Sequence, residues 1–418
     1  MLVKKMPKNS FELPVMDRWI QDHKEEVITF FQALLTIPAI SPLSGGQGEK
    51  RKADFLEHYL NGLKFGTIER YDAPDPTAEG GIRPNIVFYY GQEKTKSTLW
   101  FVCHVDIVPV GDRGAWTFDP FKPHVKEGKL YGRGAEDNGQ SLVAALFAVK
   151  CLHDLGLEPD RRVGIAFVAD EETTSKFGIE FLLKQGSIFS KADLIVVPDA
   201  GFPNGDFIEI AEKTILWMKI EVIGKQAHGS MPELGLNAHR IGMQFALELD
   251  KNLHRKYSLE NPLFKPPTCT FEPTKKETNQ ENINAVPGKD VLYFDCRILP
   301  DYHIKDVLGE IERLRSIFEK ATGSKILISF PNLTTQTLPT PADSPVVQLL
   351  STALKQVRGI DPVLGGVGGG TCGAFFRANG IPVAVYERTD EQAHKPNEYC
   401  VLDWLFEELK IFTLMMLA

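Results

Sequence analysis

The 418-residue sequence has no long apolar run and no closely paired cysteines, and it has fewer basic than acidic residues. No stretch approaches the roughly eighteen apolar residues of a membrane span, so we expect no membrane association. A formal net charge of −8 argues against nucleic acid or an anionic membrane as the main partner. The six cysteines lack the short spacings of disulfide frameworks and zinc knuckles, which favours reduced thiols and a cytoplasmic location: Cys103, Cys151, Cys269, Cys296, Cys372 and Cys400.

The length and composition are typical of a protein with two or three domains. Apolar residues make up 43% of the chain, which is enough for sizeable cores and argues against global disorder. The basic residues Lys4, Lys5 and Lys8 are not followed by a long apolar run, so we expect no signal peptide.

Strands and helices alternate in the first half of the chain. Apolar runs predict strands at 85–90, 99–102, 163–169 and 194–197. Helical spacing predicts helices at 17–35, 49–63 and 140–155. The proline-rich segment 116–129 is expected to be a loop. This order predicts an α/β fold with a mostly parallel sheet that is buried on both faces.

The pattern changes near Glu212, where alternating strands and amphipathic helices indicate a smaller inserted domain. Strands are expected at 215–223, 291–298 and 325–330, with helices at 232–253 and 304–322. We therefore expect a catalytic domain in two parts, 1–211 and 341–418, and a two-layer α+β insert at 212–340. The second part would contain helices at 346–358 and 398–417 and a strand at 381–386.

Acidic residues and histidines recur where the expected strands end: His104, Asp106, Asp137, Glu171, Glu172, Asp199 and His394. Each has an ordinary explanation, because acids favour the first turn of a helix and a lone histidine such as His153 is usually a surface or core residue. Several carboxylates that converge at successive strand ends would repel one another, however, and a divalent cation would remove that cost. The joint placement therefore predicts a metal site.

These residues and their neighbours, in this order, resemble the zinc-dependent aminoacylase and carboxypeptidase family. That family includes acetylornithine deacetylase, succinyl-diaminopimelate desuccinylase and glutamate carboxypeptidase. The resemblance runs from about Ile28 onward and rests on His104-Val105-Asp106, Gly132-Arg133-Gly134 with Asp137, Asp170-Glu171-Glu172, Ala227-His228-Gly229-Ser230, Asn282-Ile283-Asn284-Ala285-Val286-Pro287, Gly369-Gly370-Thr371 and His394. The chain departs from the usual family pattern at Cys103, at Asn138-Gly139-Gln140 and at Thr173-Thr174, without loss of a ligand.

The resemblance implies two zinc ions, or cobalt or manganese, bridged by Asp137. His104 and Asp199 would complete one site, and Glu172 and His394 the other. Two further acids would assist: Asp106 would orient the His104 imidazole, and Glu171 would be the general base that activates the metal-bridging water.

The insert would be the lid and dimerisation domain of a homodimer. His228 in it would reach the partner subunit's active site and stabilise the oxyanion. Asn284, Gly370 and Thr371 resemble substrate-contact positions. Arg297 also resembles a substrate-contact position, because a guanidinium suits a substrate carboxylate. The alternative that Arg297 forms an ion pair with Asp295 or Asp301, which are close in sequence, stays open.

The function that the resemblance implies is hydrolysis of the amide bond of small N-acyl amino acids by a dinuclear zinc enzyme. The alternative is a di- or carboxypeptidase that acts on small peptides. Such a peptidase and a deacylase of this family differ only in which ends of the substrate the pocket binds. A non-catalytic binding protein with the same fold is a more remote alternative.

Overall fold

The computed structural model describes residues 13–92 and 97–418, and the chain divides into two compact units. Unit 1 contains the described residues up to Ile210, with Thr340–Leu364 and Thr371–Ala418. Unit 2 contains Ala211–Pro339 and Gly365–Gly370. The Thr340 amide donates to the Ile210 carbonyl at 2.8 Å, so the chain leaves and re-enters unit 1 at neighbouring points.

Unit 1 is built on an eight-stranded sheet in the order β1-β2-β6-β3-β7-β16-β8-β15. The four central strands run parallel: β6 (Arg162–Val168), β3 (Thr98–His104), β7 (Leu194–Gly201) and β16 (Val383–Glu387). β1 (Thr67–Pro74) and β2 (Ile82–Tyr90) are antiparallel to their neighbours, and β8 (Phe207–Glu212) and β15 (Val363–Val367) complete the other edge. The predicted α/β fold with a largely parallel sheet is thereby confirmed.

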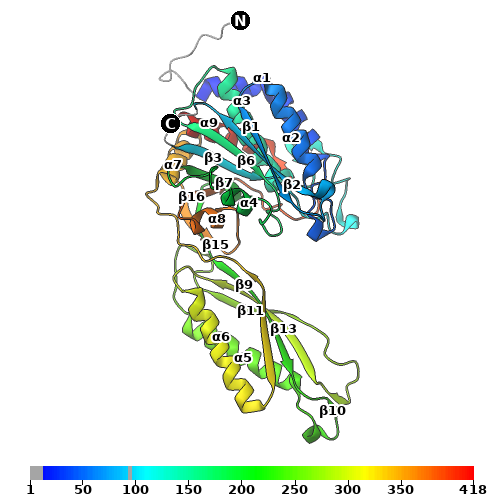
Figure 1. Cartoon of the computed structure of the whole chain (residues 1–418). Coiled ribbons are helices and arrows are strands. Elements are labelled where there is room, and N and C mark those ends of the chain that lie inside the picture. Colours follow the sequence, from blue (N-terminus) through cyan, green and yellow to red (C-terminus); the bar gives the residue numbers. More distant parts are fainter. Residues whose placement is uncertain (1–12, 93–96) are drawn as a thin grey trace. The chain divides into compact units, whose positions relative to one another are not determined.

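Helices cover both faces of this sheet (Figure 1). On one face lie α1 (Leu13–Leu35), α3 (Ser141–Asp154), α7 (Pro345–Arg358) and α9 (Leu402–Leu417), and α2 (Lys50–Leu63) lies beside them. Phe101 of β3 packs on Phe412 of α9 with ring centroids 4.6 Å apart. The next residue back, Trp100, points to the other face, which α4 (Ile179–Lys184) and α8 (Gly373–Ala378) cover through Ile179 and Phe376. Burial of both faces explains why the central strands are continuous apolar runs.

A small antiparallel sheet corrects one expectation about unit 1. The segment 116–129 is not all loop, because β4 (His124–Lys126) pairs with β5 (Lys129–Tyr131), which in turn pairs with β17 (Tyr399–Val401). β4 is short and mostly exposed, so it has no apolar pattern and exists only through its pairing.

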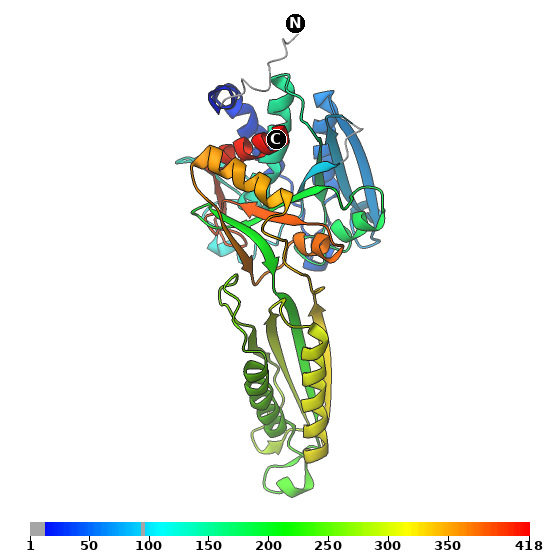
Figure 2. The same ribbon diagram turned by 90° about the vertical axis from the view of Figure 1, so that its left-hand side faces the viewer.

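Unit 2 is a four-stranded antiparallel sheet in the order β11-β13-β9-β14, with α5 and α6 on one face (Figure 2). The strands are β9 (Thr214–Ile223), β11 (Thr270–Lys276), β13 (Lys289–Ile298) and β14 (Lys325–Leu333), and the helices are α5 (Ala238–Lys256) and α6 (Ile304–Thr322). Alternate residues of β9 are buried in the core: Leu216, Met218, Ile220 and Val222. Strand β11 was not expected, and α5 begins later than expected, after a separate turn at Pro232–Leu234 and an Asn237 side chain that caps the Arg240 amide.

Three observations bear on the composition. None of the helices among residues 13–92 and 97–418 is long and apolar enough to cross a bilayer. All six cysteines are buried free thiols. Lys4, Lys5 and Lys8, on which the signal-peptide prediction rests, lie outside the described residues.

Candidate metal centre

The predicted metal ligands of unit 1 come together at one edge of the sheet. His104 ends β3, Asp199 lies in β7, and Glu171 and Glu172 follow β6. His394 lies in the loop that follows β16. Since these four strands are parallel, their carboxyl ends meet at the same edge, which is where ligands bind in open α/β sheets.

Asp137 lies between two histidines and offers one carboxylate oxygen to each. Its Oδ1 is 2.8 Å from Nε2 of His104, and its Oδ2 is 3.1 Å from Nε2 of His394. Around this carboxylate, Asp199 Oδ1 lies 3.3 Å from Nε2 of His104, and Glu172 Oε2 lies 3.0 Å from Nε2 of His394. Two clusters of donors therefore share one central carboxylate.

The donors are of the kind that could hold a metal ion. Potential ligand atoms of His104, Glu171 and Asp199 lie within 4.8 Å of one another, and so do those of His104, Asp137 and Glu172. Glu172 Oε1 is buried and has no hydrogen-bond partner among the described residues, which is costly unless a cation or another donor meets it. Imidazole nitrogen with carboxylate oxygen is a donor set that suits zinc and related divalent ions.

The crowding of these acids shifts their pKa values. Burial, reinforced by the Asp199 carboxylate, raises the pKa of Glu171 well above its ordinary value. Burial and the nearby Asp137 raise the pKa of Glu172 to about 7. Burial alone would raise the pKa of Asp137, but hydrogen bonds from His104 and His394 hold it below its ordinary value. Positive charge therefore stabilises the centre, and the metal ions predicted from the sequence would supply it.

Asp106 links His104 to the two glutamates. Its Oδ1 and Oδ2 accept the amides of Glu171 and Glu172, each at 3.0 Å. Nδ1 of His104 lies 3.0 Å from the main-chain oxygen of Asp106 and 3.6 Å from the carboxylate. The carboxylate therefore fixes the Glu171-Glu172 turn, and the main chain of Asp106 makes the shorter contact to the imidazole.

Two buried carboxylates that the sequence analysis missed hold the ligand loops. Glu136 accepts the amides of Asp390, Gln392 and Ala393, immediately before His394. Glu398 accepts the Asp137 amide at 3.2 Å and those of Gly134 and Glu136, each at 3.0 Å, and binds Nη1 of Arg133 at 2.6 Å. The only sequence signal was their position, next to Asp137 and four residues after His394.

Asp170 shapes the loop that follows the two glutamates. It has a positive φ of 66°, and its carboxylate accepts the hydroxyls of Thr173 and Thr174 and the Phe177 amide. The fully buried Arg83 donates to the same carboxylate at 3.2 Å. The two threonines that depart from the family pattern therefore serve as hydroxyl donors within this loop.

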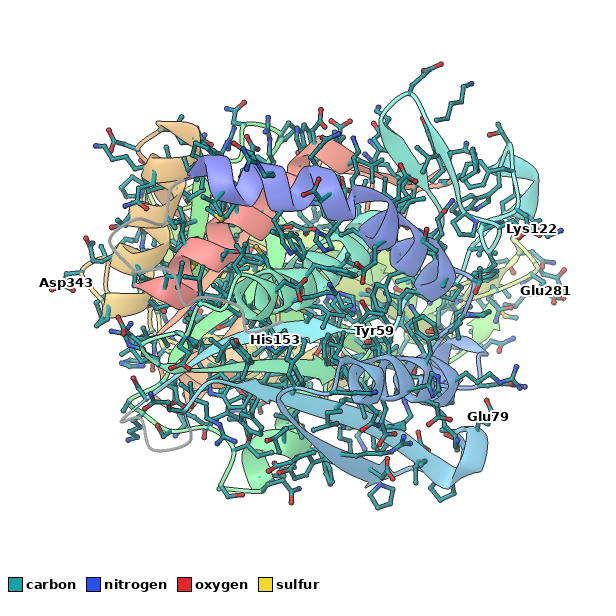
Figure 3. All side chains as sticks on the ribbon, turned by 90° about the horizontal axis from the view of Figure 1, so that it is seen from above. Tyr59, Glu79, Lys122, His153, Glu281 and Asp343 are labelled. Carbon is teal, nitrogen blue, oxygen red and sulfur yellow. The ribbon has the colours of Figure 1, made fainter. Side chains whose placement is uncertain are left out.

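The remaining predicted site residues are placed as follows. Thr371 lies in unit 1, where its hydroxyl accepts the Gly373 amide at 3.0 Å. In unit 2, Arg297 makes the ion pair with Asp295 that was the open alternative, at 2.6 Å, and donates to the Gly368 carbonyl at 2.7 Å. His228, Asn284 and Gly370 also belong to unit 2. His153, which is labelled in Figure 3, lies on α3 and is exposed, as an ordinary surface histidine is. Its ring stacks on that of Phe65 with centroids 3.9 Å apart.

Comparisons with known proteins place the chain in a family. Residues 100–418 match the family described as peptidase family M20/M25/M40. An uncharacterised metallohydrolase of Methanococcus maripaludis is 41% identical over 408 residues, which cover 93% of this chain and 98% of that protein. A succinyl-diaminopimelate desuccinylase of a Nitratiruptor species is 27% identical over 384 residues, covering 89% and 94% of the two chains.

A solved di-peptidase of Saccharomyces cerevisiae has the same fold, with a TM-score of 0.72 at 18% identity and coverage of 97% and 98%. The family match over residues 100–418 and the 41% identical relative confirm the family predicted from the sequence motifs. The chain belongs to peptidase family M20/M25/M40 and is a metal-dependent amide hydrolase.

Proposed function

We propose that the protein is a dinuclear zinc hydrolase that cleaves the amide bond of small N-acyl amino acids. The observation that carries this proposal is the Asp137 carboxylate, which directs one oxygen toward His104 and the other toward His394. Asp199 would complete the first site and Glu172 the second. The mixed imidazole and carboxylate set favours zinc, and cobalt or manganese would also fit.

When bound, two divalent cations would neutralise the clustered carboxylates, polarise the substrate carbonyl and lower the pKa of a water molecule toward ~7. The chain itself supplies the base. Glu171 lies among the donors while its amide is fixed by Asp106. It would take a proton from the attacking water and pass it to the leaving nitrogen as the carbon–nitrogen bond breaks.

His228 is suited to stabilise the oxyanion. The Ser230 amide donates to its Nδ1 at 3.2 Å, and the Ser230 hydroxyl lies 2.7 Å from the same nitrogen. Because Nδ1 accepts a hydrogen bond, the neutral imidazole carries its proton on Nε2. The exposed Nε2–H could then donate to a substrate oxygen in the partner subunit of a homodimer.

A substrate screen tests the proposed reaction. We expect zinc-loaded protein to hydrolyse N-acetyl- or N-succinyl-amino acids faster than dipeptides, and a chelator to abolish the activity until zinc is restored. Release of free amine is the readout, and apo-protein is the control. Turnover of dipeptides alone would contradict the deacylase proposal and favour the peptidase.

A complementation experiment tests the role of His228. Homodimers of Glu171→Ala and of His228→Ala should each be nearly inactive. When subunits of the two variants exchange, half of the dimers gain one intact site of two, so about a quarter of wild-type activity should return.

Mixing Glu171→Ala with His394→Ala is the matched control, because both changes damage the site of their own subunit and no intact site can form. Size-exclusion chromatography with one labelled variant would demonstrate the exchange. An inactive first mixture, with exchange demonstrated, would show that His228 serves its own subunit.

A further inference from the structure

His228 and Asn284 are carried by the same small structure within unit 2. Strand β10 (Ala227–His228) pairs with β12 (Ala285–Val286), so that His228 lies opposite Ala285. The Gly229 amide donates to the Asn284 carbonyl at 2.6 Å. We call the two segments 224–238 and 277–290 the tip of unit 2.

Close backbone contacts join the two segments of the tip. The Gly224 amide donates to the Gly288 carbonyl at 2.8 Å, and the Ala238 amide donates to the Pro287 carbonyl at 3.0 Å. A side chain on Gly229 would overlap the backbone of Asn284, so the two segments lie too close together for any residue but glycine there. Any displacement of segment 277–290 would therefore move His228 together with Asn284.

The Asp290 carboxylate lies at the base of the tip and is fully buried. It accepts Nζ of Lys276, at the end of β11, at 2.8 and 2.7 Å and Nδ2 of Asn279, in the following loop, at 2.7 Å. Nδ1 of His239, in the first turn of α5, lies 3.1 Å away. A side chain on Gly242 of α5 would overlap this carboxylate, so the helix leaves space for it.

We propose that Asp290 is a positioning residue for the reaction, which acts by holding the tip so that His228 and Asn284 keep their places. This inference rests on the proposed function of those two residues. One carboxylate joins β11, the loop at 277–284 and α5, because it accepts from Lys276 and Asn279 and lies next to His239. Asp290→Asn removes the negative charge that holds Lys276 and His239 and weakens the acceptor for Asn279, which releases the loop that leads to Asn284.

The test compares Asp290→Asn with Glu310→Gln in the full-length enzyme. Glu310 is a matched control because it is also buried in unit 2 and binds two cations, Lys256 at 2.8 Å and Arg313 at 2.6 Å. It joins α5 to α6, away from the tip. We expect Asp290→Asn to lower kcat by about tenfold or more, and Glu310→Gln to change kcat by less than about twofold.

Hydrogen exchange gives a readout that does not depend on activity. We expect peptides that contain residues 226–231 and 283–287 to exchange faster in Asp290→Asn and at the wild-type rate in Glu310→Gln. Metal content should equal that of the wild type in both variants. If Asp290→Asn does not fold, Asn279→Ala removes one hydrogen bond to the same carboxylate and should change exchange and kcat in the same direction by a smaller factor.

Combining Asp290→Asn with His228→Ala and Asn284→Ala together separates the possible failures. We expect Asp290→Asn to add less than about twofold to the loss caused by the His228→Ala/Asn284→Ala pair, because the contribution of both positioned residues is then already absent. Unchanged exchange in the tip, or losses that multiply, would overturn the positioning role. Near wild-type activity of His228→Ala would instead contradict the proposed function of His228, and hydrogen exchange would still decide whether Asp290 holds the tip.

Discussion

Glu171→Gln should lower kcat by about a thousandfold or more while both metal positions stay occupied. The proposed role of Glu171 is to accept and deliver a proton, which an amide of the same size cannot do. Because Glu171 is not one of the proposed metal ligands, metal affinity should change little. Elemental analysis beside steady-state kinetics measures both quantities.

Glu408→Gln is a suitable control for that experiment. Glu408 is also fully buried in unit 1, where burial raises its pKa to about 8 and the Ser141 hydroxyl lies 3.0 Å from its carboxylate. Since Glu408 has no proposed part in the reaction, its amide variant should keep kcat within severalfold. A metal-free Glu171→Gln protein would identify Glu171 as a ligand, and activity near wild type would remove it from the reaction.

Asp137→Ala is expected to empty both metal positions together, because one carboxylate faces both histidines. His104→Ala and His394→Ala should each weaken mainly one position, so that about one metal ion per chain remains. A calorimetric titration of the three apo-variants with zinc measures the stoichiometry, and circular dichroism confirms that each is folded. Two fully occupied positions in Asp137→Ala would rule out the bridging role.

The strands that were predicted from sequence show one of two patterns, a continuous apolar run or an alternation of buried and exposed residues as in β9. Segments 99–102, 163–169 and 194–197 are uninterrupted apolar runs because helices cover both sides of β3, β6 and β7. Strand β11 has almost no buried residue, so its sequence has neither the alternation of apolar residues nor the hydrophobicity that would predict a strand. It is ordered through its pairing with β13, a long-range contact that a local pattern does not contain.

The same distinction holds for the candidate site. Each expected ligand was recognisable because it follows an apolar run or a glycine turn. Glu136 and Glu398 were not recognisable, because they bind backbone amides of distant segments. Nothing in the neighbouring sequence distinguishes such an acid from one on the surface. Arg297 and Asp295 lie two residues apart on β13 and share a face, which is why their ion pair could be weighed from sequence alone.

The hydrogen bond between Ile210 and Thr340 has a consequence for chain entropy. Asp199 and His394 are far apart in sequence, and an unfolded segment between them would make closure of the metal centre entropically costly. The segment between Ile210 and Thr340 begins and ends at neighbouring points. Once unit 2 is folded, this long segment therefore costs no more entropy to close than a short loop would. The length of unit 2 can therefore vary without stretching the path between the two ligands, as insertions at closely spaced ends of a domain generally can.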